Sequence, residues 1–206
     1  TGMLGQAVLQ GMSLEDYVNP RHPVQQHILK TFAEMCDVDP ESILIGIDGC
    51  SAPVFAVPLY KAALGYARLC GPEHLSPERA KACRKITHAM TVYPEMVAGP
   101  ERFDTVLMEA GEGKIIAKGG AEGYQAIGLL EGACSAGSKA LGIAIKISDG
   151  DASGRARTVV SLEILRQLGA LSKQQEERLS IFDRRAIHNH RGLTIGEIRP
   201  CFKIAS

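Results

Sequence analysis

The fold class is indicated by residues 114–148, which read KIIAKGGAEGYQAIGLLEGACSAGSKALGIAIKIS. Three short apolar runs occur here, at 114–118, 125–131 and 141–148, and each predicts a β-strand. Glycines follow the first run, and residues 133–139 form a hairpin-like connection before the third. Because short links of this kind join antiparallel strands, we expect an antiparallel sheet.

Helical patterns flank this stretch on both sides. Ser76 followed by Pro77 is typical of a helix start, and Ser172 is expected to cap the final helix. Helices are expected at 3–12, starting at Pro23, from Pro58 to about Gly71, from Pro77 to about Met90, at 104–110, and from Ser153 or Gly154 to Leu168. An edge strand is expected at 195–204. The sequence therefore predicts a single α+β domain over residues 1–206, with an antiparallel sheet flanked by helices.

The composition is that of a globular protein without a polyanionic partner. Hydrophobic residues make up 45% and charged residues 22%, and 23 Lys and Arg balance 23 Asp and Glu. We therefore expect no nucleic-acid partner, and no apolar run is long enough to cross a membrane. The 6 cysteines form no C-x-x-C pair, which favours reduced thiols and a cytoplasmic location.

A turn with a carboxylate and a thiol follows the apolar run at 42–48, which predicts a buried strand. Asp48 and Cys50 stand at its end, where they could supply a metal ligand and a supporting partner. The alternative is a structural turn, in which the aspartate accepts hydrogen bonds from nearby backbone amides and the cysteine is merely buried.

A lysine followed by two glycines ends the first run of the predicted sheet. Gly119 and Gly120 allow a close approach of backbone or ligand, while Lys118 projects an ammonium into a cleft. Such a lysine activates a serine hydroxyl in some acyl-transfer enzymes. The alternative is a glycine-rich hairpin with a solvated lysine.

Other motifs favour structural interpretations. Residues 148–155 resemble a loop that caps the following helix, because the spacing of an EF-hand calcium loop is absent. The histidines lack metal-ligand spacing, and His188 and His190 are expected at the surface. No G-x-S-x-G nucleophile motif is present.

Four stretches in order resemble the bacterial thermolabile-type, or rhizobial-type, L-asparaginase family. They are residues 17–25, residues 48–56 with Asp48-Gly49-Cys50, residues 94–105 with Arg102-Phe103-Asp104-Thr105, and residues 118–123 with Lys118-Gly119-Gly120-Ala121-Glu122-Gly123. The resemblance implies hydrolysis of L-asparagine to aspartate and ammonia, and a fold similar to serine β-lactamases and glutaminases.

The resemblance also implies roles for individual residues. Lys118 matches a catalytic lysine of the serine–lysine pairs, and Cys50 matches one of two cysteines that hold zinc together with a lysine. Asp48, Gly119 and Gly120 are expected to border the substrate. The sequence leaves open whether the protein forms a homodimer.

The match begins part-way along the family pattern. The family's Cys-Ser-Gly-Lys-His segment and its catalytic serines would precede Thr1, and the chain opens with a helical pattern already under way. We therefore expect a C-terminal portion that is inactive alone, with weak or absent zinc binding. The alternatives are a glutaminase or β-lactamase-like serine hydrolase, and a degenerate protein that binds without catalysis.

Overall fold

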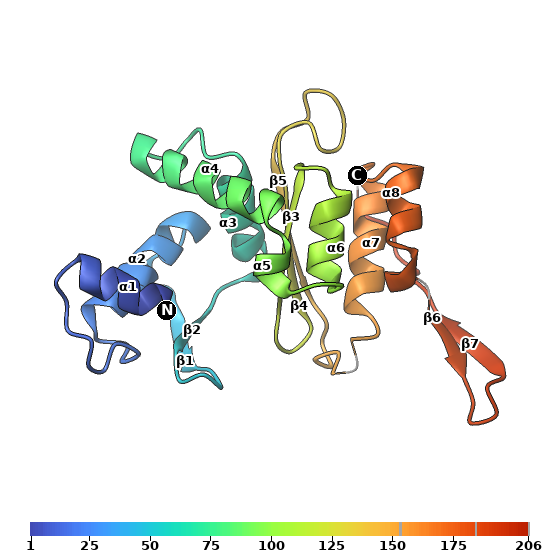
Figure 1. Ribbon diagram of the computed structural model, residues 1–206, viewed down its shortest axis with the longest axis horizontal. Coiled ribbons are helices and arrows are strands. Elements are labelled where there is room, and N and C mark those ends of the chain that lie inside the picture. The colour runs from blue at the N-terminus through green and yellow to red at the C-terminus, as the bar shows by residue number, and fades with distance from the viewer. Residues whose placement is uncertain (153, 184, 206) are drawn as a thin grey trace. The chain divides into compact units, whose positions relative to one another are not determined.

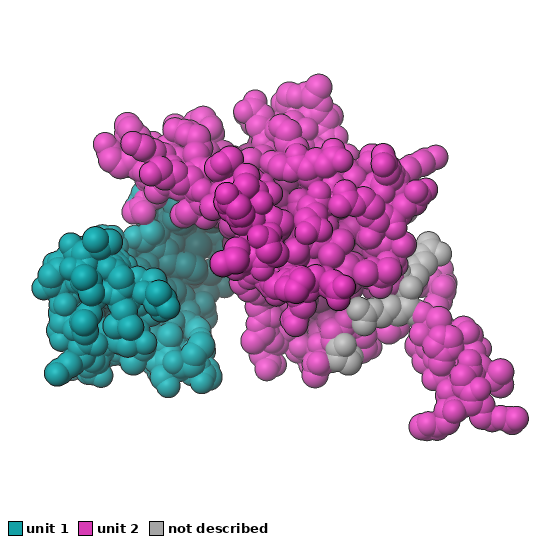
Figure 2. Space-filling model, in the orientation of Figure 1, with its two compact units in different colours: residues 1–65 teal, residues 66–206 magenta. Residues whose placement is uncertain are grey.

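The computed structural model describes residues 1–152, 154–183 and 185–205. The chain forms two compact units, residues 1–65 and residues 66–206 (Figure 2). Helix α3 (Leu59–Cys70) carries the boundary between them. The prediction of a single domain stays a prediction, and each unit is described by itself.

The first unit is built around helix α2 (Pro23–Cys36), which begins at Pro23 as the sequence predicts. His22 caps it, because its Nδ1 accepts a hydrogen bond from the backbone N–H of Val24 at 3.2 Å. Leu29 and Ala33 of α2 form a small core with Ile43. The other elements are α1 (Gly2–Leu9), the short helix η1 (Pro40–Ser42), β1 (Leu44–Ile47) and β2 (Pro53–Ala56).

The strand predicted at 42–48 exists, but the prediction that it is buried is wrong. Strand β1 pairs with β2 alone in an antiparallel two-stranded sheet. Leu44 remains 75% exposed and Ile47 59% exposed. An apolar run is typical of a strand covered on both faces, and a two-stranded sheet in this unit does not supply that cover.

The second unit contains the antiparallel sheet that the sequence predicts (Figure 1). Its order is β3 (Ile115–Gly120), β4 (Tyr124–Leu129) and β5 (Leu141–Lys146). The register pairs Lys118 with Ala126 and Gly120 with Tyr124. The α+β fold class is therefore confirmed.

Both faces of this sheet are buried, since the consecutive residues Ile115 and Ile116 are each at most 1% exposed and point to opposite faces. Helix α6 (Phe103–Ala110) packs on β3, and α7 (Arg157–Gln167) packs on β4 and β5 (Figure 1). The core includes Leu107, Met108, Ile115, Ile116, Ile127, Leu129, Ile143, Leu162 and Leu165. The remaining helices of this unit are α4 (Pro77–Val92), α5 (Glu95–Ala98), α8 (Lys173–Arg178) and η2 (Ser180–Phe182).

Local capping predictions are confirmed in this unit. The Ser76 side chain accepts a hydrogen bond from the backbone N–H of Arg79. Ser172 and Gln175 form a capping box at the start of α8. Helix α7, however, begins at Arg157, later than the predicted start; of the two predicted starting positions, residue 153 lies outside the described residues.

The C-terminal strand is not an edge of the main sheet. Strand β7 (Thr194–Ile198) is shorter than the predicted 195–204 segment and pairs with β6 (Arg185–His188) in a separate hairpin. The turn is organised by Asn189, whose Oδ1 accepts hydrogen bonds from the backbone N–H groups of Arg191 and Leu193. This local pairing replaces pairing with the three-stranded sheet. Within the described residues, the helices are all too short or too polar to cross a membrane.

Candidate active site

The lysine and the two glycines singled out in the sequence lie at the end of β3. The strand continues through Gly119 and Gly120, so Lys118 lies inside the paired region rather than at its last residue. The Lys118 side chain is exposed, and its Nζ lies 2.5 Å from the carbonyl oxygen of Gly119. The ammonium is thus held at the strand end, open to solvent.

A buried carboxylate fixes this strand end. Asp104 on α6 is only 6% exposed, and its Oδ2 accepts a hydrogen bond from the backbone N–H of Gly119 at 2.6 Å. Its Oδ1 accepts one from Nε2 of Gln125 at 2.9 Å. Gln125 is fully buried on β4, opposite Gly119 in the register. Asp104 therefore ties α6, β3 and β4 together directly beside Lys118.

A second contact from α6 positions the loop before it. The Thr105 hydroxyl donates a hydrogen bond to the carbonyl oxygen of Gly99 at 2.6 Å. This contact holds the end of α5 against the start of α6. Helix α5 contributes Val97 and Ala98 to the wall of a cavity.

That cavity, called here the Lys118 cavity, has a volume of about 470 Å³ and is open to solvent. It contains three cationic side chains and one carboxylate, so its charge favours an anionic ligand or a developing negative charge. Its lining comprises Val97, Ala98, Arg102, Phe103, Asp104, Lys118, Gly119, Gly120, Ala121 and Arg157. Asp104, Gln125 and Arg157 were not assigned to the site from the sequence, although Asp104 stands in one of the resemblance stretches.

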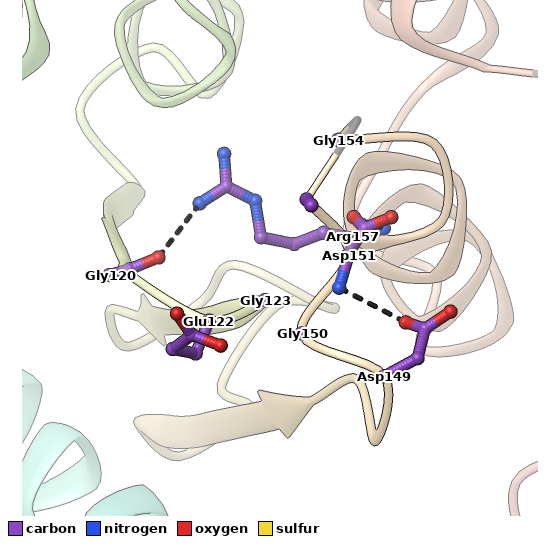
Figure 3. Close-up of a pocket in the computed structure, with 9 residues that line it drawn as sticks. Gly120, Glu122, Gly123, Asp149, Gly150, Asp151, Gly154 and Arg157 are labelled. Carbon is purple, nitrogen blue, oxygen red and sulfur yellow. Dashed lines mark hydrogen bonds between the residues drawn. The ribbon is translucent and has the colours of Figure 1, made fainter.

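Arg157 reaches the cavity from the first residue of α7. Its Nη1 lies 3.4 Å from the carbonyl oxygen of Tyr124 and 3.5 Å from that of Gly120 (Figure 3). A Cβ at Gly119 would lie only 2.4 Å from this nitrogen. A side chain at position 119 would therefore make the flexible Arg157 guanidinium shift from this place.

A smaller cavity of about 270 Å³, the Asp149 cavity, adjoins this site and shares Gly120 and Arg157 with it (Figure 3). The capping interpretation of residues 148–155 is confirmed here. The Asp151 carboxylate accepts hydrogen bonds from the backbone N–H groups of Arg155, Ala156 and Arg157. Asp149 is exposed, and its hydrogen bond from the backbone N–H of Asp151, followed by its bond with Arg155, lowers its pKa.

The turn with Asp48 and Cys50 belongs to the first compact unit, whereas Lys118, Gly119 and Gly120 belong to the second. Asp48 Oδ1 accepts hydrogen bonds from the backbone N–H groups of Cys50 and Ala52 at 2.8 and 3.1 Å. The Cys50 thiol donates to Asp48 Oδ2 at 3.3 Å, which raises the thiol pKa and lowers that of the carboxyl. The aspartate thus organises the turn as the structural interpretation predicts, but Cys50 is exposed rather than buried.

The described residues do not by themselves fit a zinc ion. Among them, three or more His, Cys, Asp or Glu side chains do not gather anywhere in a group able to hold a metal. Protein-bound zinc takes three or four protein ligands, and Asp48 and Cys50 supply at most two. The zinc expectation stays a prediction, and no chemical step is assigned to a metal here.

The fold and the site together define an α+β protein in which helices flank an antiparallel sheet and a cationic cavity opens at a strand end. Residues 1–200 match the family model of L-asparaginase II, and the chain belongs to that family. A comparison with curated proteins gave no match. The family membership supports an asparaginase-type amidohydrolase function.

Proposed function

We propose that this chain forms the cationic part of an active site that hydrolyses L-asparagine to L-aspartate and ammonia, with Lys118 as a catalytic residue. The observation that supports the proposal is the exposed Lys118 side chain on the wall of a cavity of about 470 Å³. Asp104 fixes the adjacent Gly119 backbone, so the strand that carries the lysine is held in place. L-Asparagine is the substrate that the family membership implies.

Lys118 can act on the reaction in two ways. As a neutral amine it accepts the proton of an attacking hydroxyl, which is a serine in the family that the chain resembles. As an ammonium it stabilises the negative charge that develops on the amide oxygen when the carbonyl carbon becomes tetrahedral. Both roles act on the transition state, so their loss lowers kcat rather than raising KM alone.

The test is Lys118→Ala in the protein at its natural length. We expect kcat for L-asparagine to fall by about 100-fold or more, the range found when a general base or an oxyanion donor is removed. The melting temperature should stay close to that of the wild type, because the side chain is exposed. Ammonia release and thermal unfolding are measured on the same preparations.

A matched control is Lys114→Ala. Lys114 is exposed immediately before the same strand, and its Nζ donates to the carbonyl oxygen of Glu131, outside the Lys118 cavity. We expect its kcat to remain within about twofold of the wild type. A Lys118→Ala variant with equally unchanged turnover would exclude a catalytic lysine, and Lys118→Met, which keeps an unbranched side chain, repeats the measurement.

A further inference from the structure

Arg157 is a cation at a cavity wall without a carboxylate partner among the described residues. We propose that Arg157 binds the α-carboxylate of the amino-acid substrate, and thereby makes the site selective for amino-acid amides over simple amides. The inference rests on the proposed function and names a specificity residue for it. Lys118 and Arg157 line the same cavity, so one substrate molecule can meet both.

The hydrogen-bonding capacity of Arg157 is largely unused. A guanidinium has five N–H donors, and the two bonds of Arg157 go to the carbonyl oxygens of Tyr124 and Gly120 at the long distances of 3.4 and 3.5 Å. Among the described residues, no further hydrogen bond or ion pair engages its side chain. Partly buried donors left over in this way are suited to a ligand with several acceptor oxygens.

Two other arginines of this unit, Arg155 and Arg166, show the contrast. Arg166 uses its whole guanidinium on the carboxylates of Glu163, Glu176 and Asp183. Arg155 is paired with Asp149 on the surface. Arg157 differs because Asp104, the carboxylate that lines the same cavity, already accepts hydrogen bonds from Gly119 and Gln125.

The position of Arg157 is set by its surroundings. Its backbone N–H donates to Asp151 Oδ2 at 2.9 Å, which fixes the residue at the start of α7. From there the side chain extends toward Gly120 (Figure 3), across the space left by the missing side chain of Gly119. The cationic group is therefore held ready for a ligand.

The chemistry of L-asparagine fits this arrangement. Its α-carboxylate is planar and matches the fork of a guanidinium, which can bind it through two parallel hydrogen bonds. Its side-chain amide is the group that is hydrolysed. Binding of the carboxylate by Arg157 leaves the amide as the end of the molecule that meets Lys118.

The test compares L-asparagine with 3-aminopropanamide, which is L-asparagine without its α-carboxylate. In Arg157→Gln at natural length, we expect kcat/KM for L-asparagine to fall by about 10- to 100-fold, mainly through KM, since a charged hydrogen-bonded pair is lost. The value for 3-aminopropanamide should change by less than about threefold, so the preference for L-asparagine collapses. Arg157→Lys keeps the charge but lacks the forked guanidinium. Its preference for L-asparagine over 3-aminopropanamide is expected to lie between those of the wild type and Arg157→Gln.

The control is Arg155→Gln, which removes an exposed arginine from the same loop and is expected to leave the substrate preference unchanged. A preference that survives in Arg157→Gln overturns the inference but leaves the asparaginase function intact. If Arg157→Gln does not fold, a substrate preference in Arg157→Lys equal to that of the wild type also overturns the inference.

The wild type could hydrolyse neither L-asparagine nor 3-aminopropanamide, and a binding measurement then separates the asparaginase proposal from the Arg157 proposal. That outcome counts against the proposed function, and calorimetric binding of L-aspartate and β-alanine then tests Arg157 directly. We expect L-aspartate to bind the wild type and to bind Arg157→Gln at least about tenfold more weakly. Equal affinity of wild type and variant for L-aspartate, or no binding to either, overturns the inference.

Discussion

At the scale of single residues, the site depends on Asp104. Each of its two carboxylate oxygens accepts a hydrogen bond, one from the backbone of Gly119 and one from the side chain of Gln125. Gln125 is fully buried, and its Oε1 has no hydrogen-bond partner within the described residues. Turning the amide over would present this oxygen to position 104, at the cost of the hydrogen bond that Nε2 donates to the carbonyl oxygen of Ala126 at 3.3 Å.

This arrangement predicts different results for two substitutions. Asp104→Ala removes the acceptor of the Gly119 backbone N–H and one of the two acceptors of Gln125 Nε2. We expect the free energy of unfolding to fall by about 3 kcal/mol and kcat to fall with it, because the Lys118 strand end is released. Asp104→Asn should cost less, since the turned amide of Gln125 can accept a hydrogen bond from the introduced asparagine. Urea unfolding of both variants measures the difference.

Glu109→Ala on the exposed side of α6 is the matched control for these variants, and its stability should stay within about 0.5 kcal/mol of the wild type. Equal losses for Asp104→Ala and Asp104→Asn would contradict the proposed turning of Gln125.

At the scale of elements, the start of α7 depends on Asp151. Its carboxylate is 6% exposed and accepts hydrogen bonds from three successive backbone N–H groups, at Arg155, Ala156 and Arg157. The N–H groups of Ala156 and Arg157, at the N-cap and the first position of α7, are among the donors that a helix leaves without partners at its beginning, and Arg155 immediately precedes them. The same contacts set the position from which Arg157 reaches the Lys118 cavity.

Replacement of this cap should affect both stability and substrate binding. For Asp151→Ala we expect the free energy of unfolding to fall by about 2 kcal/mol. This is at the upper end for the loss of a helix cap, because the Asp151 carboxylate is buried. KM for L-asparagine should rise in the same variant if Arg157 binds the substrate. Asp149→Ala removes a neighbouring exposed carboxylate and should cost less than half as much. Faster amide hydrogen exchange confined to the first turn of α7 would confirm that the lost Asp151 hydrogen bonds cause the instability. Unchanged exchange there would contradict it.

At the scale of the second compact unit, the core contains ionisable groups that resist ionisation. Burial raises the pKa of the Cys70 thiol from its ordinary value of 9.0 to about 12. Burial likewise raises the pKa of Tyr66 above its ordinary range. A Cβ at Gly128 would lie 2.4 Å from the Cys70 Sγ, so the thiol packs tightly on the middle strand of the sheet.

These pKa values predict alkaline unfolding. Above pH 9 the unfolded chain releases the Cys70 proton while the folded chain keeps it up to about pH 12. The folded state then binds more protons, so its stability falls as the pH rises, by up to about 1.4 kcal/mol per pH unit for one such group. Below pH 9 this group has no effect. Urea unfolding between pH 8 and pH 11 measures the slope.

Cys70→Ala should be less stable at pH 8, because the core loses packing, but its stability should fall less steeply above pH 9. Cys201→Ala, at an exposed cysteine, should keep the wild-type slope. Parallel pH curves for the wild type and Cys70→Ala would show that ionisation of this thiol does not drive alkaline unfolding.

Local patterns were sufficient for much of this fold. The three strands and their antiparallel order follow from short apolar runs joined by short links, and the caps at Ser76 and Ser172 follow from residues that bond within one turn. The lysine and glycines at 118–120 were found in the same way. Each of these features depends on contacts between near neighbours in the chain, and such contacts leave a pattern in the sequence.

Other features depend on which distant segments meet. The exposure of β1 follows from the absence of a covering layer in its unit, which an apolar run does not reveal. Asp104 and Gln125 form one network because α6 packs on the sheet, and Arg157 joins the cavity because its side chain reaches Gly119 from the start of α7. A lone aspartate, glutamine or arginine has no periodicity or spacing of its own, so its role appears only when long-range packing brings its partner to it.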